Sequence, residues 1–224
     1  EYRRDTERLS ELFDGIMRCV DLQGGEPLLN PQIMDYVKIT RDAFPYGEIR
    51  IVTNGILLMG MAEDFWKCLH KYSVMLSATE YPIHVDYNAI EKKASYYGVE
   101  YKAMRGGKNP ITMNKYPLDV KGRGVPQINF AHCVSANHCI NLRHGRMFTC
   151  PVAAKAEHLI NYFGLDMKVS ELDSVDIYAV ADGKELMERL SHPIPFCRYC
   201  RVDRVECDIP FSLSCKDRGE WLLD

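Results

Sequence analysis

Apolar residues in the first hundred positions of the chain follow two periods that alternate along the sequence. Helical spacing is found over residues 1–13, 31–43, 62–71 and 86–97. Short apolar or β-branched runs stand between these segments, at residues 16–22, 48–53, 73–77 and 99–104. This alternation predicts an α/β fold whose parallel strands are joined by crossover helices. The pattern alone does not separate an open doubly wound sheet from part of a barrel.

The sequence changes character after residue 104. Residues 105–127 contain several Gly and Pro and show no convincing period, so we expect a linker or a loop-rich joint there. Beyond it, residues 147–149 indicate a strand, residues 153–160 a weak helix and residues 183–190 a clearer one. We therefore predict two domains, residues 1–125 and residues 126–224, with the second a small α+β extension.

Composition excludes some classes of partner. The 224 residues are 46% hydrophobic and 26% charged, as in soluble globular proteins, and the formal net charge is -3. This balance gives no electrostatic reason to expect nucleic acid or a membrane surface as a partner. No apolar run is long enough to span a bilayer and no signal peptide opens the sequence, so we expect a cytoplasmic protein.

The nine cysteines are unevenly placed. Two lie in the first half, and seven lie between residues 133 and 215: Cys133, Cys139, Cys150, Cys197, Cys200, Cys207 and Cys215. Secreted disulfide frameworks usually belong to much smaller chains, so metal or cluster ligation in a reducing cytosol is the better expectation. A CxxC turn presents two thiolates to one metal, and a second pair completes four-coordination. On spacing alone, zinc is favoured over an iron–sulfur cluster.

The stretch VDLQGGEPLLNP, residues 20–31, carries the most specific chemistry in the first half. Two adjacent glycines allow positive φ and leave backbone groups open to a ligand. Glu26 is the only charged side chain on this tight loop, at the carboxyl end of a strand, where ligand sites of α/β folds gather. A carboxylate beside open carbonyls suits a cation such as a ligand's ammonium group. The alternative is a tight turn with a solvated glutamate.

Three motifs on consecutive predicted strands resemble those of radical S-adenosylmethionine (SAM) enzymes. They are GGEP at residues 24–27, TNG at residues 53–55, and Met75-Leu76-Ser77 followed by Tyr81-Pro82. The resemblance implies a partial (β/α) barrel of radical SAM type. It also implies that Gly24, Gly25 and Glu26 hold the amino group of the SAM methionine moiety. Further candidates for the SAM site are Thr53, Asn54 and Ser77.

The chain departs from this family in one large respect. The CxxxCxxC loop, whose three thiolates hold the [4Fe-4S] cluster that binds SAM, is absent from the sequence. By family layout it would stand just upstream of Glu1, so we expect the N-terminal part of the barrel to be missing from this chain. A degenerate relative without the catalytic cluster is the alternative. Cys19, inside a predicted strand, is expected to be a small buried hydrophobe.

The second half resembles the SPASM and "twitch" extensions that follow many radical SAM barrels. Gly145 to Cys150 matches their GxxxxC element, and the gap between Cys133 and Cys139 is similar to that in anaerobic sulfatase-maturating enzymes. The resemblance implies one auxiliary [4Fe-4S] cluster. Its firmest expected ligands are Cys150, Cys197 and Cys200, with Cys139 next and Cys133 its competitor. Cys207 and Cys215 are expected not to be ligands.

Together these resemblances imply a radical SAM enzyme. Such an enzyme cleaves SAM reductively to a 5′-deoxyadenosyl radical, which abstracts hydrogen from the substrate; the cofactors carry the chemistry. A peptide or protein substrate is expected first, with a small molecule as the alternative. The implied electron donor is a protein such as flavodoxin or ferredoxin. Arg105 is a weaker candidate for contacting a substrate carboxylate. The competing hypothesis is a catalytically incomplete iron–sulfur or zinc binding protein on a radical SAM-like scaffold.

Overall fold

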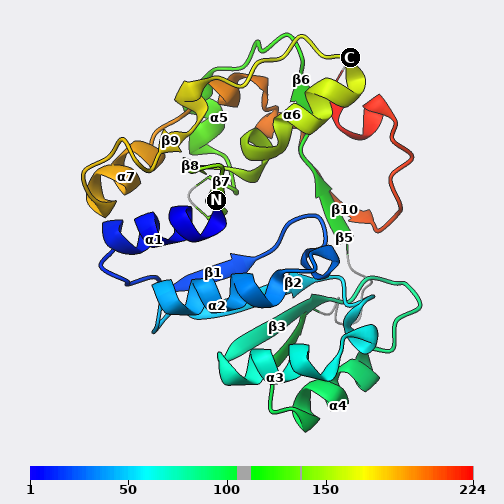
Figure 1. The fold of residues 1–224 in the computed structure, drawn as a ribbon. Coiled ribbons are helices and arrows are strands. Elements are labelled where there is room, and N and C mark those ends of the chain that lie inside the picture. The colour runs from blue at the N-terminus through cyan, green and yellow to red at the C-terminus, as the bar shows by residue number, and fades with distance from the viewer. Residues whose placement is uncertain (105–111, 137, 224) are drawn as a thin grey trace. The chain divides into compact units, whose positions relative to one another are not determined.

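A computed structural model describes residues 1–104, 112–136 and 138–223. It shows a mixed α/β chain that divides into two compact units, one covering Tyr2–Ile111 and the other Glu1 with Thr112–Asp224 (Figure 1). Within the described residues, no helix is both long enough and apolar enough to cross a membrane.

The first unit contains a four-stranded parallel sheet. The strands are β1 (Cys19–Leu22), β2 (Glu48–Thr53), β3 (Val74–Thr79) and β4 (Tyr101–Met104), and their order in the sheet is β1-β2-β3-β4. In register, Leu22 stands beside Ile51 and Ile51 beside Leu76. Because the order follows the sequence, all crossovers run in one direction; a doubly wound sheet would reverse its order. The described residues form this open sheet and no closed barrel.

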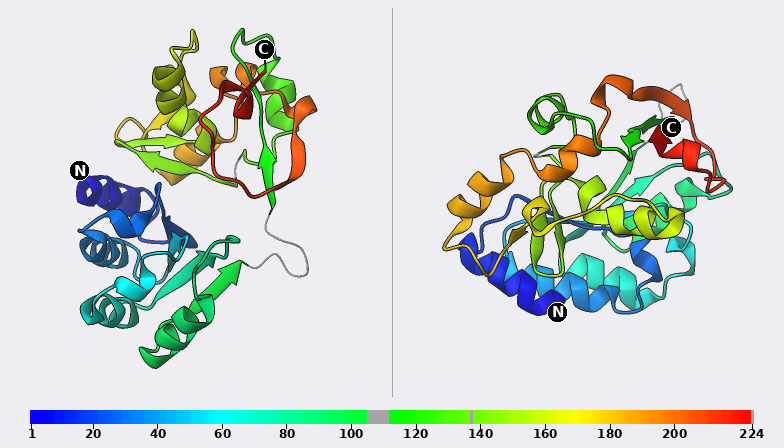
Figure 2. Two further views of the ribbon diagram at one scale, coloured as in Figure 1. Left: turned by 90° about the vertical axis from the view of Figure 1, so that its right-hand side faces the viewer. Right: turned by 90° about the horizontal axis from the view of Figure 1, so that it is seen from above.

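Four helices alternate with these strands: α1 (Tyr2–Leu12), α2 (Ile33–Ala43), α3 (Glu63–Lys71) and α4 (Tyr87–Tyr96). Crossovers that share a direction and the usual right-handed sense place their helices on the same face of a sheet. The left panel of Figure 2 shows α1–α4 along one side of the strands. The predicted alternation is therefore confirmed, with boundaries that differ by one to three residues at most ends.

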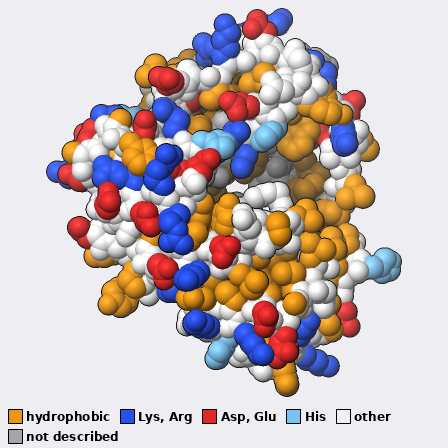
Figure 3. Space-filling model, viewed as in Figure 1, with side chains coloured by type: hydrophobic (Ala, Val, Ile, Leu, Met, Phe, Trp, Pro, Cys, Tyr) orange, Lys and Arg blue, Asp and Glu red, His pale blue; other side chains and the backbone are white. Residues whose placement is uncertain are grey.

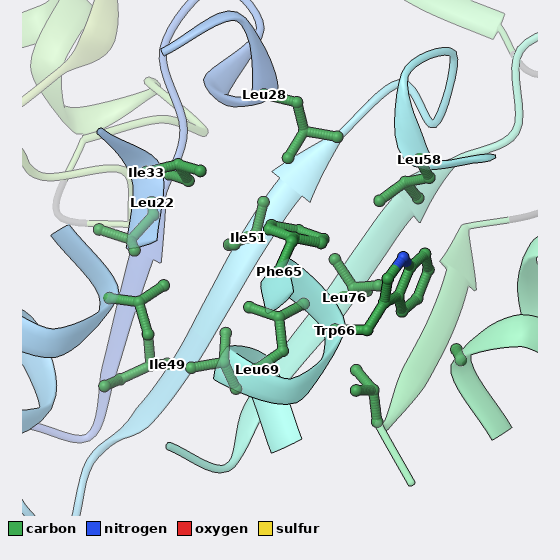
Figure 4. Close-up of a cluster of buried hydrophobic side chains, with 14 of the residues drawn as sticks. Leu22, Leu28, Ile33, Ile49, Ile51, Leu58, Phe65, Trp66, Leu69 and Leu76 are labelled. Carbon is green, nitrogen blue, oxygen red and sulfur yellow. The ribbon is translucent and has the colours of Figure 1, made fainter. Parts of the chain in front are cut away.

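The core of the first unit lies between the sheet and its helices. Figure 4 shows the side chains of Ile49 and Ile51 on β2 and Leu76 on β3 close to Phe65 and Leu69 of α3. Each of these five side chains is at most 2% exposed. Successive strand residues point to opposite faces of the sheet. Because Ile49, Ile51 and Leu76 face the helices, the residues between them face the other side.

The opposite face of the sheet carries a different set of residues. Register places Asp21 beside Arg50, and Ser77 between Val52 and Lys102. Arg50 binds Asp21 through two hydrogen bonds of 2.5 and 2.7 Å. Polar and charged groups thus line the sheet face that none of the four helices covers.

The second unit is built from short strands and three helices. Its helices are α5 (Pro126–Ala131), α6 (Pro151–Phe163) and α7 (Gly183–Leu190). β7 (Asn141–Arg143), β8 (Arg146–Phe148) and β9 (Val175–Asp176) form an antiparallel sheet. β5 (Thr112–Lys115) pairs with β10 (Glu206–Pro210), and β6 (Leu118–Asp119) pairs with β11 (Leu222–Leu223).

The boundary between the units differs from the prediction. The second unit begins at Thr112 rather than near residue 125, because β5 and β6 are bound by strand pairing to the end of the chain. The expected loop-rich joint at residues 105–127 therefore contains two strands and the beginning of α5. Local sequence did not reveal these strands, since their partners lie about a hundred residues further on.

Candidate functional site

The loop after β1 holds the GGEP sequence and is anchored from one side. Pro27–Leu29 form a 3₁₀ turn, and Leu28 in this turn is 7% exposed. Leu58, in the 3₁₀ turn Leu58–Gly60 after β2, is fully buried. Figure 4 shows Leu28 near the carboxyl end of β2 and Leu58 near that of β3. Each loop is thus fixed by an apolar side chain over the neighbouring strand.

Glu26 joins the GGEP loop to the turn that follows β2. One carboxylate oxygen accepts hydrogen bonds from the Thr53 hydroxyl at 2.6 Å and the Leu28 N–H at 3.2 Å. The other accepts the Asn54 N–H at 3.0 Å. Two sequence motifs that are 27 residues apart along the chain therefore form one hydrogen-bonded unit. Hydrogen bonds to an ionised acceptor are stronger than neutral ones, so this link stabilises the loop pair.

Gly24 and Gly25 differ from the expectation in one respect. Neither has positive φ, whereas Gly55 does, at φ 81°. Both are exposed, and a Cβ added at either position would meet no atom within 4 Å. Neither the backbone conformation nor the packing of the chain requires glycine here. Their lack of side chains leaves the backbone open to a close neighbour that is not part of this chain.

Tyr87, at the start of α4, ties together the carboxyl ends of β2 and β3. Its hydroxyl lies 3.0 Å from the Asn54 carbonyl oxygen and 3.3 Å from that of Thr79. A Cβ on Gly55 would come within 2.9 Å of the Tyr87 ring, which together with its positive φ explains the glycine. Burial raises the pKa of Tyr87 above its ordinary value. Sequence reasoning did not single out this residue.

The carboxyl-end loops also expose large apolar side chains. Leu29 follows β1, and Ile56 and Met59 follow β2; their exposures run from 47% to 72%. Figure 3 shows apolar side chains gathered on the side of the first unit that faces the viewer. An apolar rim around open backbone groups is typical of a small-molecule site. Arg105, the weaker sequence candidate, lies outside the described residues.

A cavity of about 440 Å³ elsewhere in this unit is less suited to a ligand. Arg41 lies in its wall and donates hydrogen bonds to five backbone carbonyls, including those of Tyr72 and Gly47. Its guanidinium is therefore engaged in bracing the amino ends of β2 and β3, and the cavity offers no free cation at this position.

Four cysteines of the second unit lie within range of one another's charge. In each of the six pairs among Cys133, Cys150, Cys197 and Cys200, the charge of one thiol raises the pKa of another. Burial is the larger cause, and it raises the pKa of Cys150 to about 11 and that of Cys200 higher still. Cys150 and Cys197 are 8% and 9% exposed, within an apolar cluster. Three distant segments of the chain thus bring four thiols into one place.

Cys150 stands at a position that favours a thiolate. It is the N-cap of α6, and its sulfur accepts the Ala153 N–H at 3.4 Å. The N-terminus of a helix stabilises negative charge, and N–H bonds to sulfur lower the pKa of a thiol. This local effect opposes burial at Cys150 without outweighing it in the metal-free protein.

Cys133, rather than Cys139, is the thiol that the structure places near the other three. The thiol near Cys150, Cys197 and Cys200 is that of Cys133, whereas Cys139 is exposed and forms none of these pairs. Cys207 and Cys215 are exposed, and that they are not ligands stays a prediction.

Cys19 is not the buried residue that its strand position predicted. It begins β1, is only partly buried, and its thiol lies 3.5 Å from an Asp21 carboxylate oxygen and 3.7 Å from one of Glu48. Desolvation and then the Asp21 charge raise the pKa of Cys19 to about 11.

No group of three or more His, Cys, Asp or Glu side chains within the described residues stands at metal-ligating separation. The four thiols share one region of the second unit, at separations wider than those of a coordination sphere. Comparisons with models of protein families and with curated protein sequences give no match for this chain.

Proposed function

We propose that this chain belongs to a radical SAM enzyme, with SAM bound at the carboxyl ends of the strands and an auxiliary [4Fe-4S] cluster in the second unit. The observation that carries the proposal is the link from Glu26 to Thr53 and Asn54. It joins two of the motifs on which the resemblance rests, on neighbouring strands of a parallel sheet with sequential order. Such an order suits part of a (β/α) barrel.

The residues at the carboxyl ends fit the methionine end of SAM. Open backbone at Gly24 and Gly25 would receive the ammonium group, with the Glu26 charge nearby. Since three donors already hold Glu26, its main role is to fix the loop while the glycine carbonyls make the contact. Asn54 and Ser77 would line the remainder of the site.

The donor set of the second unit fits an iron–sulfur cluster. Four sulfurs in apolar surroundings are supplied by Cys133, Cys150, Cys197 and Cys200. The Ala153 N–H donates to the Cys150 sulfur, and hydrogen bonds to ligand sulfurs tune the reduction potential of a cluster. When bound, SAM and the clusters of such enzymes supply a 5′-deoxyadenosyl radical for hydrogen abstraction. The chain's own residues bind and orient these groups and exclude water.

The proposed substrate is a peptide or protein, with a small molecule as the alternative, and the proposed reductant is a flavodoxin or ferredoxin. These assignments rest only on the resemblance of the second half to SPASM and twitch extensions. A second candidate function is a zinc or iron–sulfur binding protein without catalysis. It is favoured by the suitability of four thiolates for zinc.

Anaerobic iron, sulfide and zinc analysis separates these functions. The protein is prepared from the longest open reading frame that contains this sequence, and its clusters are reconstituted. About eight iron per chain indicates two [4Fe-4S] clusters and supports the enzyme. About four iron, lost when Cys150, Cys197 and Cys200 are replaced by Ala, leaves only the auxiliary site and refutes the enzyme. One zinc without iron favours the second candidate.

A further inference from the structure

A buried asparagine holds the CxxC turn of the second unit from behind. Asn129 in α5 is 7% exposed, and its side-chain amide donates hydrogen bonds to the carbonyl oxygens of Cys197 and Cys200, both at 2.8 Å. The two residues that receive these bonds are the two cysteines of the turn. Both amide hydrogens are thereby used, on acceptors 68 and 71 residues away in the chain.

Gly124 completes the support of this turn. Its N–H donates to the Arg198 carbonyl oxygen at 2.9 Å, so three carbonyls of residues 197–200 are held from one segment. A Cβ at position 124 would lie 2.5 Å from the Asn129 amide nitrogen and 2.7 Å from the Arg198 oxygen. Real Cβ atoms do not approach so closely, so only glycine permits the arrangement.

The same helix also positions a third thiol. Cys133 follows α5 by two residues, and its N–H donates to the Phe130 carbonyl oxygen at 3.1 Å. A short helical segment therefore connects Asn129 to Cys133. Asn129 fixes the backbone of the CxxC pair, and Cys133 adds a third thiol from another part of the chain. The direction of each Cα–Cβ bond follows from the backbone it belongs to, so fixing these carbonyls restricts where the sulfurs point.

We propose that Asn129 is a positioning residue of the four-thiol site, fixing the backbone from which the CxxC pair and Cys133 reach a common metal. This inference rests on the proposed metal site. An amide is required because both acceptors are carbonyl oxygens: a carboxylate of the same shape offers no donor and repels them. Partners of this kind, one step removed from the metal, commonly change metal affinity by about 10–100-fold.

Titration of the reduced, metal-free chain with Co²⁺ tests the proposal without requiring activity. Thiolate-to-cobalt charge-transfer absorption reports sulfur ligation directly. Asn129→Asp preserves shape and is compared with Asn141→Asp, whose amide also donates to a cysteine carbonyl, that of Cys139, outside the four-thiol group. We expect about 10–100-fold weaker Co²⁺ binding for Asn129→Asp and an unchanged affinity for Asn141→Asp.

The possible results separate this inference from the proposed function. Wild-type affinity in folded Asn129→Asp overturns the positioning role and leaves the metal site intact. Absence of thiolate absorption in the wild-type chain refutes the metal site and the inference with it. If circular dichroism shows Asn129→Asp to be unfolded, Gly124→Ala is measured instead. Its added Cβ displaces the hydrogen bonds to residues 197–200 while the Asn129 amide remains. Weaker Co²⁺ binding then supports the positioning role, and wild-type binding overturns it.

Discussion

The hydrogen-bonded link between Glu26 and Thr53 makes a quantitative prediction about the first unit. Replacing Thr53 by Val preserves shape and removes the hydroxyl that donates to the Glu26 carboxylate at 2.6 Å. It also removes the acceptor of the Gly55 N–H, at 3.1 Å. Thr53 is 3% exposed, so water does not readily replace either bond.

The expected loss follows from these contacts. A hydrogen bond to a charged group contributes about 1.5–3 kcal/mol, and the partly exposed carboxylate places Thr53→Val near the lower end, at about 2 kcal/mol. Glu26→Gln removes the charge and makes the new side-chain amide group face an N–H or O–H donor. We expect it to lower the free energy of unfolding by about 1–2 kcal/mol. Since both changes break the same bond, the double variant should lose about 1 kcal/mol less than the sum.

Tryptophan fluorescence offers a readout confined to this unit. The chain has two tryptophans, of which Trp66 is fully buried in the core of the first unit and Trp221 is half-exposed in the second. In a Trp221→Phe background, thermal unfolding followed through Trp66 reports on the first unit alone. For a unit of this size, Tyr2–Ile111, 1 kcal/mol corresponds to a shift in Tm of about 4 °C.

A matched control fixes the interpretation. Thr79→Val changes the same residue type at the end of the next strand, where the described hydrogen bonds go to the carbonyl oxygen rather than the hydroxyl. It should change Tm less than Thr53→Val. If the effects of Glu26→Gln and Thr53→Val add within about 0.5 kcal/mol, the two side chains are not coupled and the link between the motifs is refuted.

Three further predictions concern other contacts. Tyr87→Phe removes the hydroxyl bonded at the ends of β2 and β3 and should destabilise the first unit by about 1 kcal/mol in the same fluorescence assay. Alkylation of Cys19 should be slow at pH 8 and accelerate as the pH rises towards 11, because its raised pKa keeps the thiol protonated; Asp21→Asn should accelerate it at pH 8. Cys133→Ser should lower bound metal per chain by elemental analysis, whereas Cys139→Ser should not.

Each of these predictions has a result that contradicts it. Equal Tm changes for Tyr87→Phe and for Tyr96→Phe, at a ring that is 82% exposed, would show that the Tyr87 hydroxyl contributes nothing. Cys19 reacting at pH 8 as fast as exposed Cys207 in the same sample, measured by mass spectrometry, would contradict its raised pKa. Loss of metal on changing Cys139 rather than Cys133 would restore the order expected from spacing.

The sequence predicted those elements whose signals are local, in both units. β2 was predicted at residues 48–53 and is found at Glu48–Thr53, since alternation and β-branched residues define it. α7 matches at both ends, since Asp182 caps its first turn and Gly183–Leu190 carry the apolar spacing. The strands β5 and β10 gave no such signal, because each is stabilised by pairing with a distant strand rather than by a buried face.

The candidate ligand site stays a prediction. Gly24, Gly25 and Glu26 suggested a ligand at one strand-end loop, but nothing local indicated that Thr53 holds Glu26. The spacing of Cys197 and Cys200 predicted a pair, and Cys139 was expected ahead of Cys133 as a further ligand, whereas in the structure Cys133 lies nearer the pair. Tyr87 and Asn129 carry no motif, and their importance follows only from the atoms they reach.

The order of strands and helices, the positions of the strand-end loops and the cysteine pair were determined by the sequence itself. Periodicity, turn residues and short spacing act within a few residues. Tertiary structure alone decided which groups bind Glu26, which thiols lie near one another, and that Asn129 and Gly124 hold the CxxC turn. These depend on strand register and helix packing, which bring together atoms 27 to 71 residues apart in the chain.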